Sequence, residues 1–179
     1  YLSTRVDTFR MKDGVSVSYL CYNMEDVPIC YNRYLTKRHM EEELSEAIKQ
    51  GLGTCLNVQR FARGFDIEVG ALGVDVIVGD YETLVDVNLP IRLSRGDVVI
   101  EENEFEVGFD VPLGALYGVS QDVVNVETQI GEFEQLSYML AHKGEFVIDK
   151  KRPYPDKLYI LKTKDSEYKF QFFVQGEEL

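Results

Sequence analysis

The sequence contains no tryptophan, only two histidines and three cysteines, and no run of the roughly 18 apolar residues that a membrane-spanning helix needs. The signatures of several common enzyme classes are also missing: the sequence has no G-x-S-x-G, no P-loop, no G-x-G-x-x-G, no H-E-x-x-H and no C-x-x-C. We therefore predict no catalytic, cofactor-binding or metal-binding residue and no cofactor.

Positive charge is scarce and unevenly placed. The formal net charge is −12, which argues against nucleic acid as a partner because such binding relies on Lys and Arg at phosphates. Residues 96–142 contain no Lys or Arg but ten acidic residues, whereas residues 143–169 contain eight basic and five acidic residues. This separation fits two differently solvated faces. It also fits a head-to-tail contact between copies of the chain, since complementary potentials steer association.

Two segments of alternating polarity, residues 84–93 and 104–113, dominate the middle of the chain. Apolar side chains take every second position in both, which predicts strands with one apolar and one polar face. Upstream, residues 65–69 and 74–78 predict two shorter strands, with a tight reversal between them at Gly70 and Gly73. Strands joined by short turns predict an antiparallel four-stranded meander at about 64–113.

Segments with apolar residues at helical spacing flank this meander on both sides. Thr36 is a typical N-cap, and six residues recur at three- and four-residue intervals up to about residue 56: Met40, Leu44, Ala47, Ile48, Gly51 and Cys55. A second helical region covers about 113–142. We predict an α+β fold in which helices at about 37–56 and 113–142 pack on the meander, with an N-terminal strand or hairpin and a C-terminal hairpin. Residues 1–14 are predicted to be a connector or flexible lead-in, and residues 15–179 a single domain.

The cysteines leave two alternatives open. Cys21 and Cys30 flank a turn at residues 24–28, so they either pair across a hairpin, as in an oxidising compartment, or stay reduced. Cys55 is expected to be a small buried apolar residue on the first helix.

Two groupings of polar side chains have the composition of ligand sites. His39 with Glu42 and Glu43 has spacing that places three metal-binding side chains on one helix face, but solvated charge explains the pattern better. Glu102, Glu104, Glu106 and Asp110 are expected to form an acidic row on the outer face of the fourth strand; carboxylate oxygens suit calcium, but a flat strand rarely makes them converge.

An ordered set of short motifs lies in residues 28–125: Glu41-Glu42-Glu43-Leu44, Cys55-Leu56-Asn57, Gly64-Phe65-Asp66-Ile67-Glu68, Val85-Asp86-Val87-Asn88-Leu89-Pro90-Ile91, Phe105-Glu106-Val107 and Val111-Pro112-Leu113-Gly114. This set resembles a family of uncharacterised archaeal membrane-anchored proteins with an exported α+β domain. The resemblance implies an extracytoplasmic domain on the cell surface with no assigned activity. An anchor upstream of Tyr1 is then its expected link to the membrane.

We therefore predict a non-enzymatic surface domain that acts by protein–protein contact, as an oligomer or a filament of copies. The last strand is expected at a sheet edge, where it would template pairing with another chain. The alternatives are a small-molecule or glycan-binding ectodomain and a hydrolase that uses acidic residues. The predicted interaction residues are Tyr168, Phe170, Phe172 and Val174 in the last strand, Lys150, Lys151 and Arg152 in a basic patch, and Glu102, Glu104 and Glu106 in the acidic row.

Overall fold

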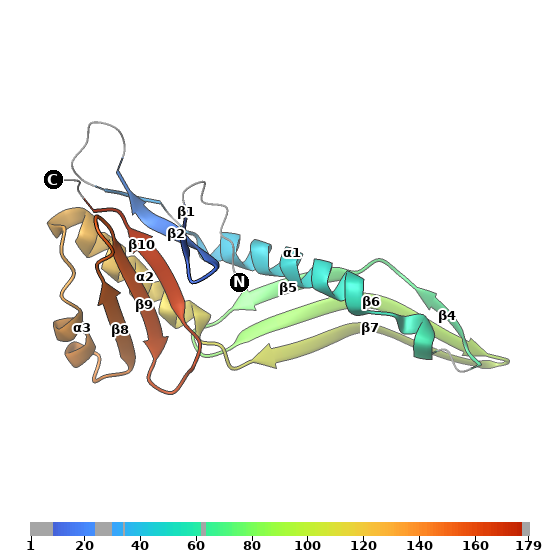
Figure 1. The fold of residues 1–179 in the computed structure, drawn as a ribbon. Helices are drawn as coiled ribbons and strands as arrows, with labels where there is room; N and C mark the ends of the chain where they lie inside the picture. The colour runs from blue at the N-terminus through green and yellow to red at the C-terminus, as the bar shows by residue number, and fades with distance from the viewer. Residues whose placement is uncertain (1–8, 24–29, 34, 62–63, 177–179) are drawn as a thin grey trace.

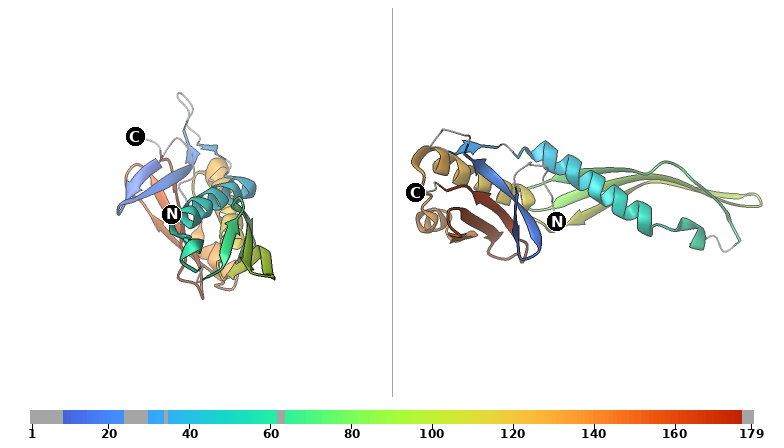
Figure 2. Two further views of the ribbon diagram at one scale, coloured as in Figure 1. Left: turned by 90° about the vertical axis from the view of Figure 1, so that its right-hand side faces the viewer. Right: turned by 45° about the horizontal axis from the view of Figure 1, so that its top comes forward.

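The chain folds into two parts, which we call the head and the arm (Figure 1). The computed structural model describes residues 9–23, 30–33, 35–61 and 64–176. The head contains a six-stranded sheet with helices α2 and α3, and the arm contains a four-stranded sheet with helix α1. The arm projects from the head as a long, narrow extension (Figure 2). The predicted α+β class is confirmed.

The head sheet joins strands from near both ends of the sequence. Its order is β1 (Phe9–Lys12), β2 (Val15–Tyr22), β10 (Phe170–Val174), β9 (Lys157–Thr163) and β8 (Phe146–Lys151), and β3 (Tyr31–Asn32) also pairs with β2. Strands β2 and β10 run parallel, while the other neighbours are antiparallel. The predicted hairpins therefore exist, as β2–β3 and β8–β9, but they belong to one sheet.

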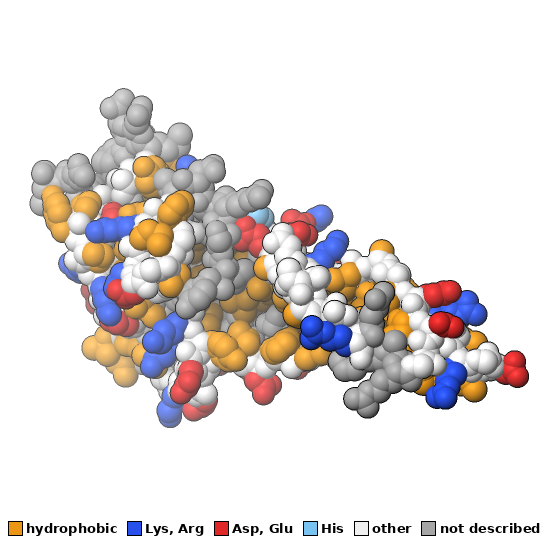
Figure 3. Space-filling view, turned by 45° about the vertical axis from the view of Figure 1, so that its right-hand side comes forward, with side chains coloured by type: hydrophobic (Ala, Val, Ile, Leu, Met, Phe, Trp, Pro, Cys, Tyr) orange, Lys and Arg blue, Asp and Glu red, His pale blue; other side chains and the backbone are white. Residues whose placement is uncertain are grey.

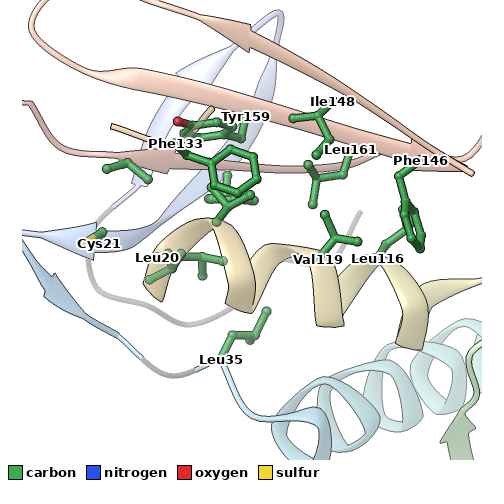
Figure 4. Packing of buried hydrophobic residues seen from close by; sticks show 14 of the residues in the cluster. Leu20, Cys21, Leu35, Leu116, Val119, Phe133, Phe146, Ile148, Tyr159 and Leu161 are labelled. Carbon is green, nitrogen blue, oxygen red and sulfur yellow. The ribbon is translucent and has the colours of Figure 1, made fainter. Parts of the chain in front are cut away.

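Helix α2 (Leu113–Ile130) covers one face of the head sheet, and the short helix α3 (Gln135–Ala141) lies beside β8. Apolar residues of α2 at three- and four-residue spacing, such as Leu116, Val119 and Val123, are buried against the sheet. Figure 4 shows Leu116 and Val119 pointing toward Leu161 and the neighbouring strands. Burying such a side chain contributes about 1.5–3 kcal/mol, so this layer is the main source of head stability.

A smaller cluster stabilises the opposite face of the head sheet. Tyr19 and Phe173 stack there with ring centroids 5.2 Å apart. The buried Asp156 carboxylate accepts hydrogen bonds from the Tyr19 hydroxyl (2.6 Å) and from the Arg10 guanidinium (2.9 Å). Burial and the Asp156 carboxylate raise the pKa of Tyr19 to about 12. This network fastens the edge strand β1 to the head.

The arm sheet is built around β6 (Thr83–Arg95). Strand β7 (Val98–Phe109) pairs along one side of β6, while β4 (Asp66–Val69) and β5 (Gly73–Val78) share the other side end to end. Both β4 and β5 are antiparallel to β6 and therefore run in the same direction. The predicted reversal at Gly70 and Gly73 is wrong, because the chain there only steps along one edge of β6.

A bulge in β6 changes which side chains share a face. Between Asn88 and Ile91 the strand advances three positions while β7 advances two. Residues directly opposite each other share a face, so Val85 and Val87 lie on the side of Val107 and Phe105, whereas Leu93 pairs with Ile100 on the other side. The expectation of one continuous apolar face along residues 85–93 is therefore wrong.

Helix α1 (Lys37–Cys55) packs on β5 of the arm sheet. The predicted N-cap is confirmed, because the Thr36 hydroxyl accepts a hydrogen bond from the His39 amide at 3.2 Å. Three residues of this helix, Leu44, Ile48 and Leu52, pack with Val74, Val76 and Val78. The predicted apolar face is displaced by this orientation: Ala47, Gly51 and Cys55 are exposed, and Cys55 is a free thiol.

Two boundaries differ from expectation. Helices α2 and α3 pack on the head sheet, so α1 is the helix that covers the meander. Residues 9–12, assigned to the lead-in, form β1 because their alternating side chains pair with β2, while residues 1–8 lie outside the described part of the chain.

Candidate interaction site

Strand β7 forms an open edge of the arm sheet. All 12 of its residues are exposed, and within the described residues it pairs with β6 alone. The backbone N–H and C=O groups along its outer side therefore face solvent. A long, flat edge strand of this kind is a template for pairing with another chain.

The β5 part of the opposite edge is closed by α1. The Ser45 hydroxyl accepts a hydrogen bond from the Val76 amide at 3.0 Å, and the Glu41 carboxylate accepts one from the Val78 amide, also at 3.0 Å. These side chains satisfy outward-facing amides of β5, which are then no longer free to pair with another strand. The arm thus protects the β5 part of one edge and leaves the β7 edge open.

The two faces of β7 differ in character. Phe105, Val107 and Phe109 share the face on which α1 packs, yet they are 40–48% exposed because α1 covers only the β5 side of that face. Glu104 and Glu106 lie on the opposite face. There Asp75, Asp86 and Glu106 stand abreast on three neighbouring strands. Three members of the predicted acidic row, Glu102, Glu104 and Glu106, share this outer face, whereas Asp110 follows the end of β7. Over residues 104–109, β7 therefore presents an edge that is apolar on one side and acidic on the other.

A groove of about 1340 Å³ runs between α1, the uncovered part of the arm sheet and the head. Its apolar lining includes Ala47, Val85, Phe109, Leu113 and Phe170. Figure 3 shows hydrophobic side chains gathered where the arm meets the head and again along the arm. This groove extends the apolar side of the β7 edge toward the head.

The predicted basic patch is largely engaged within the chain. The Lys150 ammonium is nearly buried and donates to a Glu132 carboxylate oxygen and to the Phe133 carbonyl (2.7 Å). Arg152 donates to the same Glu132 oxygen, and Lys151 lies 3.6 Å from the Asp149 carboxylate. Burial raises the pKa of Glu132, but hydrogen bonds from Lys150 and Lys157 outweigh it and lower the pKa below the usual value. These cations therefore stabilise the head.

The predicted role of the last strand as a sheet edge is wrong. β10 lies between β2 and β9 and pairs with both, so neither of its sides is open. Phe172 and Val174 are buried in the head core because central strands pack both faces, and Phe170 is partly buried. Tyr168 precedes the strand and is 54% exposed.

The cysteines and histidines are the remaining residues that could bind a metal ion or form a crosslink. Cys21 and Cys30 are joined by a disulfide with an Sγ–Sγ distance of 2.02 Å. The His39 imidazole lies 3.4 Å from a Glu43 carboxylate oxygen, while Glu42 is paired with Arg38. Among the described residues no three histidine, cysteine or carboxylate side chains are grouped so as to hold a metal ion, and no described helix is long and apolar enough to cross a membrane.

The acidic residues of β7 were predicted from the sequence, but the open edge of this strand was not. The available signal was the proximity of four glutamates and Asn103 on one strand, since charged residues commonly mark strands that lie at sheet edges. Comparison with protein-family models, curated proteins and solved structures finds no match to this chain.

Proposed function

We propose that this chain is a non-enzymatic, extracytoplasmic domain of a cell surface, which acts by protein–protein contact and self-associates through the open edge of β7. The observation that carries the proposal is the contrast between the two edges of the arm sheet. Helix α1 covers β5 with two side-chain hydrogen bonds, while β7 exposes its backbone and three large apolar side chains. The Cys21–Cys30 disulfide is compatible with an oxidising compartment.

Light scattering over a concentration series, without reductant, tests this proposal. We expect the molar mass of the unmodified chain to rise above the 20.6 kDa of one copy as the concentration increases. Val107→Lys should hold the mass near that of one copy, because a lysine on an edge strand opposes strand addition. Ile77→Lys is the matched control: Ile77 is 50% exposed, as against 48% for Val107, but lies on the edge that α1 closes. A chain that stays monomeric at every concentration contradicts the proposal.

The groove supports a second candidate function, the binding of an apolar ligand by an ectodomain. Its volume of about 1340 Å³ exceeds that of typical small-molecule sites, and its lining combines apolar side chains with a few polar groups. A fluorescent fatty acid is a suitable probe, and its emission should rise on binding. Ala47→Trp, which narrows the groove, should weaken this binding about tenfold, whereas Thr54→Trp, on an exposed part of the same helix outside the groove, should not. Equal binding by both variants would exclude the groove as the site.

A further inference from the structure

We propose that the partner of β7 is β7 of a second copy, paired antiparallel about a two-fold axis at Val107. This inference rests on the proposed function, because it names the partner of the same open edge. The paired segment is residues 105–109, Phe-Glu-Val-Gly-Phe, whose apolar residues occupy the same positions when the segment is read in either direction. A segment with this symmetry is complementary to its own copy, which is what a two-fold contact requires.

The hydrogen bonds of β5 determine which backbone groups of β7 point outward. The Val76 amide points away from β6 to α1, so Val76 and Val85, which lie opposite each other, turn their backbone groups away from one another. Val85 therefore points its groups at Val107, and Val107 points its own at β6. Because this orientation alternates along a strand, the outward groups in this part of β7 belong to Glu106 and Gly108.

An antiparallel pairing centred on Val107 fits this orientation. Glu106 of each copy lies opposite Gly108 of the other, so outward groups meet outward groups and exchange backbone hydrogen bonds. Val107 lies opposite its own copy, and Phe105 lies opposite Phe109, in pairs whose side chains come closest together. On the apolar face, three side chains from each copy, all 40–48% exposed in a single chain, then pack on one another.

The same register keeps like charges from lying directly opposite one another. Each Glu106 faces a glycine, and the two Glu106 carboxylates lie diagonally across the contact, where water and salt screen them. Any centre from Glu101 to Glu106 sets two glutamates directly opposite one another, which opposes association. Centres at Val99 or Gly108 pair only residues 98–100 or 107–109 before two acidic residues meet or the strand ends. The centre at Val107 therefore gives the longest compatible ladder.

The contact stops at both ends of the paired segment. At one end the Val111 amide donates to the Phe109 carbonyl at 2.6 Å, a turn that takes the chain out of the strand before Asp110 would lie opposite Glu104. Toward the arm tip, Glu102 and Glu104 lie on the remaining edge, and charged side chains on an edge strand oppose further strand addition. The pairing is thus confined to residues 105–109.

A two-fold contact closes on itself. The two arm sheets become one continuous sheet that carries α1 of each copy on the same face, and the two heads lie at opposite ends. Each copy uses its open segment once, so the product is a dimer and not a filament. We expect the molar mass to approach twice the 20.6 kDa of one copy at high concentration and to rise no further.

Cysteine crosslinking tests the register. A Cys55→Ser background removes the exposed free thiol. In that background Val107→Cys sets two thiols opposite one another at a Cα separation of about 4.5 Å, within the range of disulfides. We expect mild oxidation to convert most of this variant into a covalent dimer on a non-reducing gel. Phe105→Cys and Phe109→Cys should each crosslink at least about tenfold more slowly alone, but should form a covalent dimer when mixed, because these positions face each other only across the contact.

A charge pair tests the same register without a covalent bond. Gly108→Lys places a lysine opposite Glu106 of the second copy, and the pair occurs twice in the dimer, so association should tighten about tenfold. A Cβ at Gly108 would meet only side-chain atoms, at 3.4 Å or more, which the arm accommodates. Ile100→Lys is the matched control. Ile100 is 52% exposed on the same face of β7, but it has no partner in this register, so association should change less than about twofold.

The outcomes separate this inference from the proposed function. The pairing about Val107 is overturned, while self-association stands, if the unmodified chain associates but Val107→Cys does not crosslink. The same holds if Phe105→Cys crosslinks with itself, if the two lysine variants have equal effects, or if the mass rises beyond two copies. If the unmodified chain never associates, both proposals fail. All the substituted side chains are exposed, and circular dichroism verifies that each variant is folded.

Discussion

Replacing Glu127 with alanine is expected to lower the free energy of unfolding by about 3–5 kcal/mol, the largest single effect predicted for this chain. The Glu127 side chain is 1% exposed. One carboxylate oxygen accepts from the Tyr159 hydroxyl and from the Phe133 amide (3.0 Å), and the other accepts from the Lys157 ammonium at 2.7 Å. Alanine removes the acceptor for all three groups and leaves the buried hydroxyl and amide without partners.

Urea unfolding of Glu127→Ala beside Glu132→Ala measures this difference. Glu132 also binds Lys157, at 3.2 Å, but its side chain is 37% exposed. Water can replace the Glu132 contact of the exposed Arg152, and the nearly buried Lys150 keeps the Phe133 carbonyl as an acceptor, so a smaller loss of about 1–2 kcal/mol is expected for that variant. Burial and the hydrogen bond to Glu127 raise the pKa of Tyr159, which keeps its hydroxyl protonated as a donor. Equal losses in the free energy of unfolding would show that the Glu127 network stabilises the chain no more than the Glu132 contacts do.

Gly114→Ala is expected to destabilise the chain by about 1–3 kcal/mol by forcing the head and the arm apart where they join. Gly114 is the second residue of α2, and its amide donates to the Gly79 carbonyl in the β5–β6 turn at 2.8 Å. A Cβ at this position would lie 2.7 Å from that carbonyl oxygen and 2.8 Å from its carbon. Backbone atoms cannot turn away as a flexible side chain does, so one of the two segments must move.

Gly118→Ala supplies the matched control in the same helix. A Cβ at Gly118 would meet no atom within 4 Å, and alanine restricts the unfolded chain more than glycine does. This variant should therefore gain about 0.5–1 kcal/mol. Thermal unfolding of both variants, followed by circular dichroism, should give melting temperatures that move in opposite directions. Melting temperatures that rise together would contradict the assigned contact at Gly114.

Local sequence signals predicted the local structure well. The Thr36 cap and the spacing of Met40, Leu44 and Ile48 define α1, because capping and helical periodicity act within a few residues. Residues 74–78 were predicted as a strand, and β5 covers them: Val74, Val76 and Val78 face α1, while Asp75 and Ile77 face solvent. These features depend on neighbours in the chain, which a sequence displays directly.

Features that depend on distant partners were not predictable in the same way. The extra residue between Asn88 and Ile91 turns the apolar side chains of the outer half of β6 to the other face, and an alternating sequence gives no sign of such a bulge. The same limit applies to β10. Its alternation fits an edge strand and a central strand equally, and only the parallel pairing with β2 decides between them.

The candidate interaction site was predicted in part. Glu102, Glu104 and Glu106 were identified by charge, and the structure places them on one side of β7. Their importance depends on which strand edge remains open, and that follows from where α1 packs. Lys150 and Arg152 looked available in the sequence, but Glu132 lies within reach of both only after the head has folded.

The parallel pairing of β2 with β10 also fixes an order of events during synthesis. Cys21 of β2 has Val174 as a partner in β10, so β2 emerges from the ribosome long before the strand that completes its sheet. The arm, whose helix and strands are contiguous in sequence, can form its contacts meanwhile, because contacts close in sequence form sooner. Until β10 arrives, Val17 and Leu20 lack much of the sheet that buries them, and a chaperone that covers residues 15–22 during this interval would protect the nascent chain.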